Sequence, residues 1–352
     1  MLFWEFNRVT DYNFKTLEIV NKTKESYGFD AVNLSLENQN IDSLGLLIDD
    51  LSMIPNFDSG DQAEYFIRWC AENEEICDDT TIYATTFPIN HMTYIPSIDS
   101  YDFSEIEVYE VQNTNAYYID LYEVNEHIYD NPSDNPIEKW IHYPQDQISY
   151  VEAETFCQNR TNLIDFSNSA VPNFTIINSS AGFRLPTELE WEIAARVDFN
   201  DFEINSEGNI IASKNDYYDF PYQLGIAGII DCNSANTIGC TEQAGIPTKL
   251  VGSFSYYTSP NGLYDCSGNV SEWVSQYFST LHFSDNRPIL RGGDYNSTTL
   301  EAKSTSYIYQ DETFDGYGTG FRTVISADEF LLEWKCALNP CYSSECSQVC
   351  DE

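Results

Sequence analysis

The sequence contains few basic residues. Its 352 residues include 16 Lys and Arg against 57 Asp and Glu, which gives a formal net charge of −41 at pH 7. A protein that binds nucleic acid or an anionic membrane presents a basic surface, because phosphate groups repel carboxylates. We therefore expect no nucleic-acid partner for this chain.

Long apolar runs are absent as well. No stretch of about 18 apolar residues occurs, so we expect no transmembrane segment. The opening residues MLFWEFNR also lack the basic and apolar regions of a signal peptide, in the chain as given. The composition is nevertheless that of a folded protein, because 42% of the residues are hydrophobic and 15% are aromatic.

Histidine is scarce, with four residues, and no CxxC pair occurs among the ten cysteines. The even count and the short spacings favour disulfides in an oxidising compartment, hence an extracellular or cell-surface location. Zinc is the weaker interpretation, because the spacing of the last four cysteines fits no common zinc module. The short separation of Cys232 and Cys240 predicts a disulfide that closes a loop.

Periodicity divides the chain into three parts. Residues 1–89 include two stretches with helical spacing, 42–51 and 61–73, so we expect this segment to be partly helical, and we assign it no function. From about residue 90, short β-like runs such as 116–122 alternate with polar loops. Residues 328–352 form a cysteine-rich tail.

Two helices are expected within the central part. One is predicted at 149–160 and the other at 186–196, where a proline opens the helix, acidic residues follow and an arginine ends it. Few helices, short strands and long loops together indicate an α+β domain.

Four motifs follow one another in the central part: FRLPTELEWEIAAR at 183–196, GLYDCSGNVSEWV at 262–274, LRGGDY at 290–295 and GFR at 320–322. In this order they resemble the formylglycine-generating enzyme family, also called sulfatase-modifying factors. The family fold is a variant of the C-type lectin fold. The resemblance implies a C-type-lectin-like, loop-rich α+β domain at 90–327, with few short strands and two or more helices.

The resemblance also implies calcium. In the family, the segment DCSGNVSE at 265–272 wraps a calcium ion, a hard cation that takes six to eight oxygen ligands. By position, the ligands would be the side chains of Asp265 and Glu272 and the carbonyls of Gly268 and Val270. A second family calcium site would involve Asn236 and Thr237, although the family's aspartate is not evident in that shorter loop.

The family's catalytic cysteines are missing. Formylglycine generation depends on two cysteines after the Gly-Gly motif, which bind copper(I) and engage the substrate cysteine. Those positions fall on Ser297 and Ala302, and copper(I) requires soft thiolates, so copper is not expected. Relatives that form carbon–sulfur bonds hold non-haem iron with histidines, and residues 1–90 contain none.

The sequence therefore favours a non-catalytic, calcium-stabilised, lectin-like binding domain of a secreted or cell-surface protein, with a protein or glycan ligand. A structural role in a larger surface assembly is not distinguished from it. The alternative is an oxidoreductase of the formylglycine-generating type, acting on a cysteine or serine of a sulfatase-like substrate through another site, for example at Cys266. The candidate ligand surface, at the position of the family's substrate groove, comprises Asp294, Tyr295, Asn296, Tyr307, Tyr309 and Tyr317.

Overall fold

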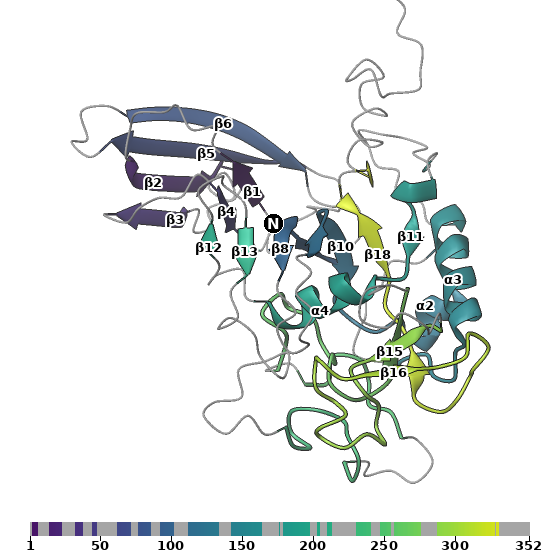
Figure 1. The fold of residues 1–352 in the computed structure, drawn as a ribbon. Coiled ribbons are helices and arrows are strands. Elements are labelled where there is room, and N and C mark those ends of the chain that lie inside the picture. Colours follow the sequence, from purple (N-terminus) through teal and green to yellow (C-terminus); the bar gives the residue numbers. More distant parts are fainter. Residues whose placement is uncertain are drawn as a thin grey trace, which may run out of the picture. The chain divides into compact units, whose positions relative to one another are not determined.

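The chain divides into two compact units (Figure 1). Unit 1 comprises Met1–Ile89 with Asn168–Ala170, and unit 2 comprises Asn90–Ser167 with Val171–Glu352. The structure, a computed structural model, describes residues 2–5, 14–22, 32–37, 44–47, 62–71, 77–85, 92–101, 112–133, 142–163, 176, 179–197, 203–204, 210–212, 230–240, 247–254, 257–275, 287–327 and 329–330.

Unit 1 is built from antiparallel strands. A four-stranded sheet has the order β3-β2-β5-β6, with bounds β2 (Phe14–Asn21), β3 (Val32–Glu37), β5 (Gln62–Ala71) and β6 (Cys77–Thr85). β1 (Leu2–Glu5) pairs with β4 (Leu44–Leu47). The prediction of helices at 42–51 and 61–73 is therefore wrong.

The reason lies in the ambiguity of short apolar runs, which fit the helical and the strand period about equally well. β5 is rich in aromatic and β-branched residue types, which favour strands. Its register with β6 places Cys70 opposite Cys77, at one end of the pair. The two cysteines therefore lie at one end of the β5–β6 strand pair.

Unit 2 contains three four-stranded sheets among its described residues, with the orders β11-β18-β10-β7, β12-β13-β8-β9 and β16-β15-β14-β17. The first sheet consists of β7 (Met92–Ile95), β10 (Tyr117–Asp120), β11 (Phe183–Arg184) and β18 (Val324–Ser326). The second consists of β8 (Ile98–Tyr101), β9 (Gln112–Thr114), β12 (Glu203–Ile204) and β13 (Ile210–Ala212). The third consists of β14 (Ser271–Val274), β15 (Ile289–Arg291), β16 (Tyr307–Tyr309) and β17 (Thr319–Gly320).

The first sheet joins the two ends of the region in which the motifs occur. β10 pairs with β7 on one side and with β18 on the other. The GFR motif, which leads into β18, is thereby held beside the YEVN segment that follows β10, where Val124 N donates to Phe321 O at 2.9 Å. The arrangement assembles one site from distant parts of the chain.

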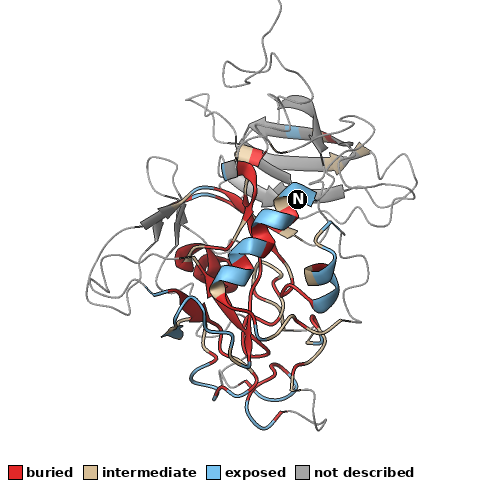
Figure 2. Ribbon diagram, turned by 90° about the vertical axis from the view of Figure 1, so that its right-hand side faces the viewer, coloured by how far each residue is buried: buried red, intermediate tan, exposed pale blue. Residues whose placement is uncertain are grey.

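Both predicted helices are confirmed. α3 (Tyr150–Leu163) buries one side, whereas α4 (Glu188–Arg196) is buried at all nine residues (Figure 2). α4 begins after Thr187, whose hydroxyl accepts from Glu190 N in a capping box, so the proline precedes the cap instead of opening the helix. Two shorter elements are α2 (Glu126–Asp130) and the 3-10 helix η2 (Ser179–Ala181).

The carboxyl end of α4 is capped by Asn261, the residue before the motif at 262–274. Asn261 Nδ2 donates to the carbonyls of Ala194 at 3.1 Å and Val197 at 2.8 Å. The last carbonyls of a helix lack partners within the helix, so this amide satisfies two of them. It fixes the approach to the predicted calcium segment relative to α4.

The cysteine-rich tail predicted at 328–352 falls outside the described residues, apart from 329 and 330. In the described ranges, no helix combines the length and the apolar character needed to cross a bilayer.

Candidate functional site

Buried arginines and carboxylates form an ionic framework inside unit 2. Five arginines pair with acidic side chains at 3.3 Å or less. The ionic framework comprises Arg160 with Asp120, Arg184 with Glu190, Arg196 with Glu192, Arg291 with Glu188 and Glu192, and Arg322 with Glu272.

Arg291 ties β15 to α4. Its Nη1 donates to Glu188 at 3.3 Å and its Nη2 pairs with Glu192, while Nη2 also donates to the carbonyl of Ser304 at 2.7 Å. The next residue, Gly292, has φ +81°, and a Cβ there would lie 3.0 Å from the carbonyl oxygen of Cys266. The framework therefore fixes where the loop after the Gly-Gly motif begins.

Arg322 neutralises Glu272. Its Nε and Nη2 each donate to a different oxygen of that carboxylate at 2.5 Å, and Trp191 Nε1 donates to Oε2 at 2.7 Å. All three side chains are buried. Glu272 Oε2 thus receives two hydrogen bonds and Oε1 receives one, so Oε1 retains acceptor capacity.

The predicted calcium segment has a specialised backbone. Asp265, Gly268 and Asn269 all have positive φ, at 55°, 78° and 66°. A Cβ at Gly268 would lie 2.2 Å from the carbonyl oxygen of Asn236, so only glycine fits there. The segment folds tightly against the second predicted calcium position.

The Asp265 carboxylate is buried and only half satisfied. Oδ2 accepts from Gly252 N at 2.6 Å, whereas Oδ1 is buried without a hydrogen-bond partner. Burial raises the pKa of Asp265 to about 6, against the Gly252 N–H and the charge of Arg322, which lower it. A buried oxygen in this state lacks a cation or donor.

Glu123 follows strand β10 and belongs to the same site. The sequence did not predict this role. Its carboxylate accepts from Asn269 Nδ2 at 2.6 Å and from Val270 N at 3.1 Å. Burial raises the pKa of Glu123 well above its usual value, and the charges of Asp265 and Glu272 add to the effect. None of the four motifs contains Glu123, and its place in the site became evident once folding placed it beside Asn269.

The buried charges of the described residues do not balance. Seven carboxylates are buried: Asp120, Glu123, Glu188, Glu190, Glu192, Asp265 and Glu272. Five of these belong to the ionic framework, which also contains five arginines. Glu123 and Asp265 have no arginine in salt-bridge contact, so the site carries a buried excess of two negative charges when both are ionised.

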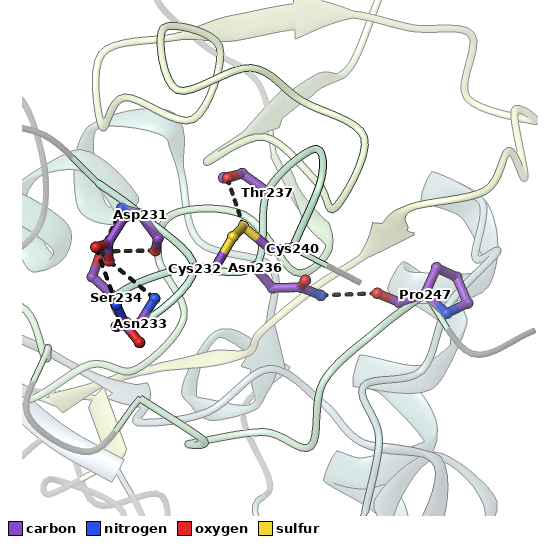
Figure 3. Close-up of a disulfide and its surroundings, with 8 residues drawn as sticks. All are labelled: Asp231, Cys232, Asn233, Ser234, Asn236, Thr237, Cys240 and Pro247. Atoms are coloured by element: carbon purple, nitrogen blue, oxygen red, sulfur yellow. Dashed lines mark hydrogen bonds between the residues drawn. A yellow bond between two sulfur atoms is a disulfide. The ribbon is translucent and has the colours of Figure 1, made fainter. Parts of the chain in front are cut away.

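The second predicted calcium position lies in a loop closed by a disulfide (Figure 3). The predicted Cys232–Cys240 bond is present, and Thr237 Oγ1 lies 3.7 Å from Cys240 Sγ. Asn236 is fully buried, and its Nδ2 donates to the carbonyl of Pro247 at 2.9 Å. Its Oδ1 is buried without a partner, which is the second such oxygen in the region.

Other groups occupy the positions of the family's catalytic cysteines. Ala302 is completely buried and packs in a cluster with Ile230, Ala235 and Tyr257. Ser297 is buried, and its hydroxyl donates to Asp294 Oδ1 at 3.0 Å. The disulfide-closed loop contributes to this packing, because Ile238 N donates to Ser297 O at 3.0 Å.

The free cysteines of the described residues are Cys157 and Cys266, and both are buried. Burial raises the pKa of each thiol, so neither forms a thiolate at neutral pH. Cys266 Sγ donates to the carbonyl of Tyr264 at 3.7 Å.

The candidate ligand surface is only partly exposed. Tyr307, Tyr317 and Asn296 are exposed, while Asp294 and Tyr309 are half-buried. Tyr295 is buried, with its hydroxyl 3.5 Å from Asp146 Oδ2, so its side chain is not exposed on the candidate ligand surface.

These features define a class of protein. The model of the sulfatase-modifying factor enzyme 1-like domain matches residues 90–327, and the chain belongs to this family. The predicted family and its C-type-lectin-like α+β fold are thereby confirmed.

Individual relatives share limited sequence identity with this chain. The formylglycine-generating enzyme of Streptomyces coelicolor is 27% identical over 166 residues, which is 45% of this chain and 47% of that protein. The chain thus matches about half the length of this curated relative.

Similar solved structures include Treponema denticola variable protein 1, CarF and PvdO from Pseudomonas aeruginosa. Their identities are 19%, 19% and 16%, and their TM-scores are 0.45, 0.43 and 0.44. The matches cover 71%, 67% and 67% of this chain and 96%, 98% and 94% of the respective structures.

Proposed function

We propose that this chain is a non-catalytic, calcium-stabilised binding domain of a secreted or cell-surface protein, with a protein or glycan ligand. The observation that carries the proposal is the packing of Ala302. Its methyl group lies in an apolar cluster with Ile230 and Ala235, at the position where the family places a copper-binding cysteine. A hydroxyl at Ser297 and a methyl at Ala302 do not fit copper(I), which requires thiolates.

Cys266 offers no substitute site. A thiol acts as a metal ligand or nucleophile in its deprotonated form, and burial raises the pKa of this one. Its Sγ is also directed to a backbone carbonyl of its own motif. The geometry therefore favours the binding function over the formylglycine-generating oxidoreductase, the alternative hypothesis.

A direct assay separates the two. The purified full chain is incubated with copper(I) and a cysteine-containing sulfatase-motif peptide, with the Streptomyces coelicolor formylglycine-generating enzyme run in parallel as the positive control. We expect mass spectrometry to show the mass loss of formylglycine formation only for the control enzyme. Turnover by this chain would overturn the proposal.

Calcium fits the buried charges. When both are ionised, Glu123 and Asp265 carry two negative charges without an arginine partner, and one divalent cation would neutralise them. Asp265 Oδ1 has no partner, and Glu272 Oε1 keeps acceptor capacity beside Arg322. The carbonyls of Gly268 and Val270 would complete a mixed carboxylate and carbonyl set of the kind calcium prefers.

This donor set is consistent with the lack of a three-residue cluster of metal-ligating side chains among the described residues. Among the described residues, no three side chains of His, Cys, Asp or Glu converge as metal ligands. A site that draws half of its ligands from backbone carbonyls needs only two such side chains. Bound calcium would supply charge neutralisation, while Glu123 holds the ligand loop through Asn269 and Val270.

The calcium proposal predicts a thermal shift. We expect chelation to lower the melting temperature, because a ligand bound only to the folded state stabilises it by about 2.7 kcal/mol at a hundredfold excess over Kd. Asp265→Asn should reduce this shift, since it removes the negative charge of the side chain and leaves it a single oxygen. Asp130→Asn, at an exposed position on α2, is the control and should keep it.

Differential scanning calorimetry with and without chelator measures both variants. An unchanged midpoint in the wild-type chain contradicts the site, and an undiminished shift in Asp265→Asn contradicts the assignment of this ligand.

A further inference from the structure

Most of the exposed large apolar side chains described in unit 2 belong to the segment 300–317 and to the disulfide-closed loop. Among the described residues, eight large hydrophobic side chains are exposed, and two of these, Val151 and Leu163, lie on α3. The other six define what we call the outer face: Ile238, Leu300, Tyr307, Ile308, Phe314 and Tyr317. Five of them fall within residues 300–317.

Printed contacts connect the members of the outer face. Ile238 N donates to Ser297 O at 3.0 Å, and Ser297 holds Asp294. Asp294 in turn lies against Gly318, the residue after Tyr317, because a Cβ on that glycine would be 2.2 Å from Asp294 Oδ2. The three segments that carry Ile238, Leu300 and Tyr317 therefore meet around Asp294 and Ser297.

The remaining members are joined through short loops. Ser306 Oγ donates to Leu300 O at 2.8 Å, which connects Leu300 to β16 and its exposed Tyr307 and Ile308. The Phe314 ring lies over Gly316, where an added Cβ would approach the ring to 2.1 Å. Tyr317, Leu300 and Ile238 are the most exposed, at 72%, 69% and 59%. Apolar side chains this exposed, on segments that these contacts join, indicate an interaction surface.

The outer face is also acidic. Glu301, Asp311, Glu312 and Asp315 are exposed within the same loops. The basic residues of the segment are fewer: Arg287 lies over the ring of Tyr309, Lys303 is half-buried, and Arg291 is buried in the ionic framework. A partner that docks here gains by bringing positive charge with its apolar groups.

We infer that the outer face binds a cationic protein segment in which lysine or arginine alternates with aliphatic or aromatic side chains. The inference rests on the proposed binding function and names its partner class. A second copy of this chain is disfavoured, because each copy carries −41. A glycan is disfavoured because three of the six side chains are aliphatic and offer no aromatic ring for a sugar, while the carboxylates repel acidic glycans.

Three synthetic peptides of equal length test the partner class. The first alternates Lys with Tyr and Leu, the second replaces Lys by Glu, and the third replaces Tyr and Leu by Ser. We expect fluorescence anisotropy at physiological salt to give about tenfold tighter binding of the first peptide than of either control, because it alone matches both the charge and the apolar area. A neutral oligosaccharide should not compete.

Matched variants test the location. Leu300→Ser should weaken binding of the first peptide about fivefold to tenfold, whereas Leu163→Ser, at another exposed leucine on α3, should leave it unchanged. The double variant Glu312→Gln with Asp315→Asn should reduce the salt dependence of binding. Glu126→Gln with Asp130→Asn, which removes the same charge from α2, should not.

Several results overturn the inference. These are equal binding of the first and third peptides, binding of the acidic peptide, competition by the oligosaccharide, no binding at all, or equal effects of the two leucine variants. None of them bears on catalysis. The proposed function fails by a different result, the formation of formylglycine in the copper assay, so the two failures are distinguishable.

Discussion

The ionic framework and the outer face both contain many carboxylates, but these are neutralised differently. Inside unit 2, five buried or half-buried arginines hold five buried carboxylates at 3.3 Å or less. On the outer face, exposed carboxylates lie among exposed apolar side chains and few basic residues. The framework therefore uses charge to hold the fold, and the outer face presents charge to solvent.

The difference shows where in the molecule the net charge of −41 is located. Four arginines that lie within the motifs, Arg184, Arg196, Arg291 and Arg322, belong to the framework, and acidic residues accompany them inside. Two buried carboxylates, Glu123 and Asp265, have no arginine in salt-bridge contact. The acidic excess thus extends from the surface into the site where we propose calcium.

The largest expected effect is at the centre of the framework. Arg322→Met leaves Glu272 buried without its cation, and we expect a loss of about 3–5 kcal/mol in the free energy of unfolding. Arg184→Met is the matched change at a pair whose arginine side chain is 38% exposed, where we expect about 1 kcal/mol or less. Urea denaturation at saturating calcium measures both.

A second substitution controls for lost packing. Arg322→Met combined with Glu272→Gln removes the charge that was left unpaired and should recover part of the stability. If the double variant is no more stable than Arg322→Met, the loss comes from packing, and the charge explanation is wrong.

Substitution of two leucines compares the contribution of the interior to the free energy of unfolding with that of the outer face. Leu263 is buried close to the predicted calcium segment, and we expect Leu263→Ala to cost about 2–5 kcal/mol through the cavity it leaves. Leu300→Ala, at an exposed position, should change stability by less than about 0.5 kcal/mol. A large loss of stability in Leu300→Ala would show that the outer face is part of the fold instead of a docking surface.

The smallest expected effect concerns the start of α3. Glu152 accepts from the backbone N and the hydroxyl of Ser149, and Ser149 accepts from Glu152 N, which is a capping box. Ser149→Ala should cost about 1 kcal/mol. The equivalent box at Thr187 and Glu190 on α4 is largely buried, so Thr187→Ala should cost more.

This capping box also gives a pH dependence. The hydrogen bonds from Ser149 lower the pKa of Glu152 below its ordinary value of 4.5. A group with a lowered pKa in the folded state stabilises it above the unfolded value and loses that contribution as the pH falls through the folded value. The advantage of the wild type over Glu152→Gln should therefore persist at neutral pH and shrink below about pH 4.5. Thermal melts across the acid range would contradict this if the difference grew on acidification.

Local patterns predicted some elements well and others poorly. The helices α3 and α4 have capping residues and matching charge at their ends, so sequence alone located them. β5 contains apolar residues at spacings that fit a helix, yet it forms a strand because its partners β2 and β6 satisfy its backbone. Pairing between distant strands is not encoded in a local window.

The candidate site shows the same division. Motif order identified the family, whereas the calcium segment and the functional reading of Ser297 and Ala302 stay predictions. Tyr295 and Tyr317 both looked available to a ligand, but one is buried and the other exposed, because neighbouring loops cover the first. Exposure depends on what packs over a residue, which its type does not specify.

By itself, the sequence determined the charge, the family and which chemical groups are present, since these depend only on residue identities and their order. The tertiary structure decided which charges remain uncompensated and which apolar side chains face solvent. Folding placed Glu123 beside Val270 because the segment after β10 meets the segment before β14, and it packed Ala302 against Ala235 of the disulfide-closed loop. Electrostatic and packing energies depend on distance in space, and only the folded chain sets those distances.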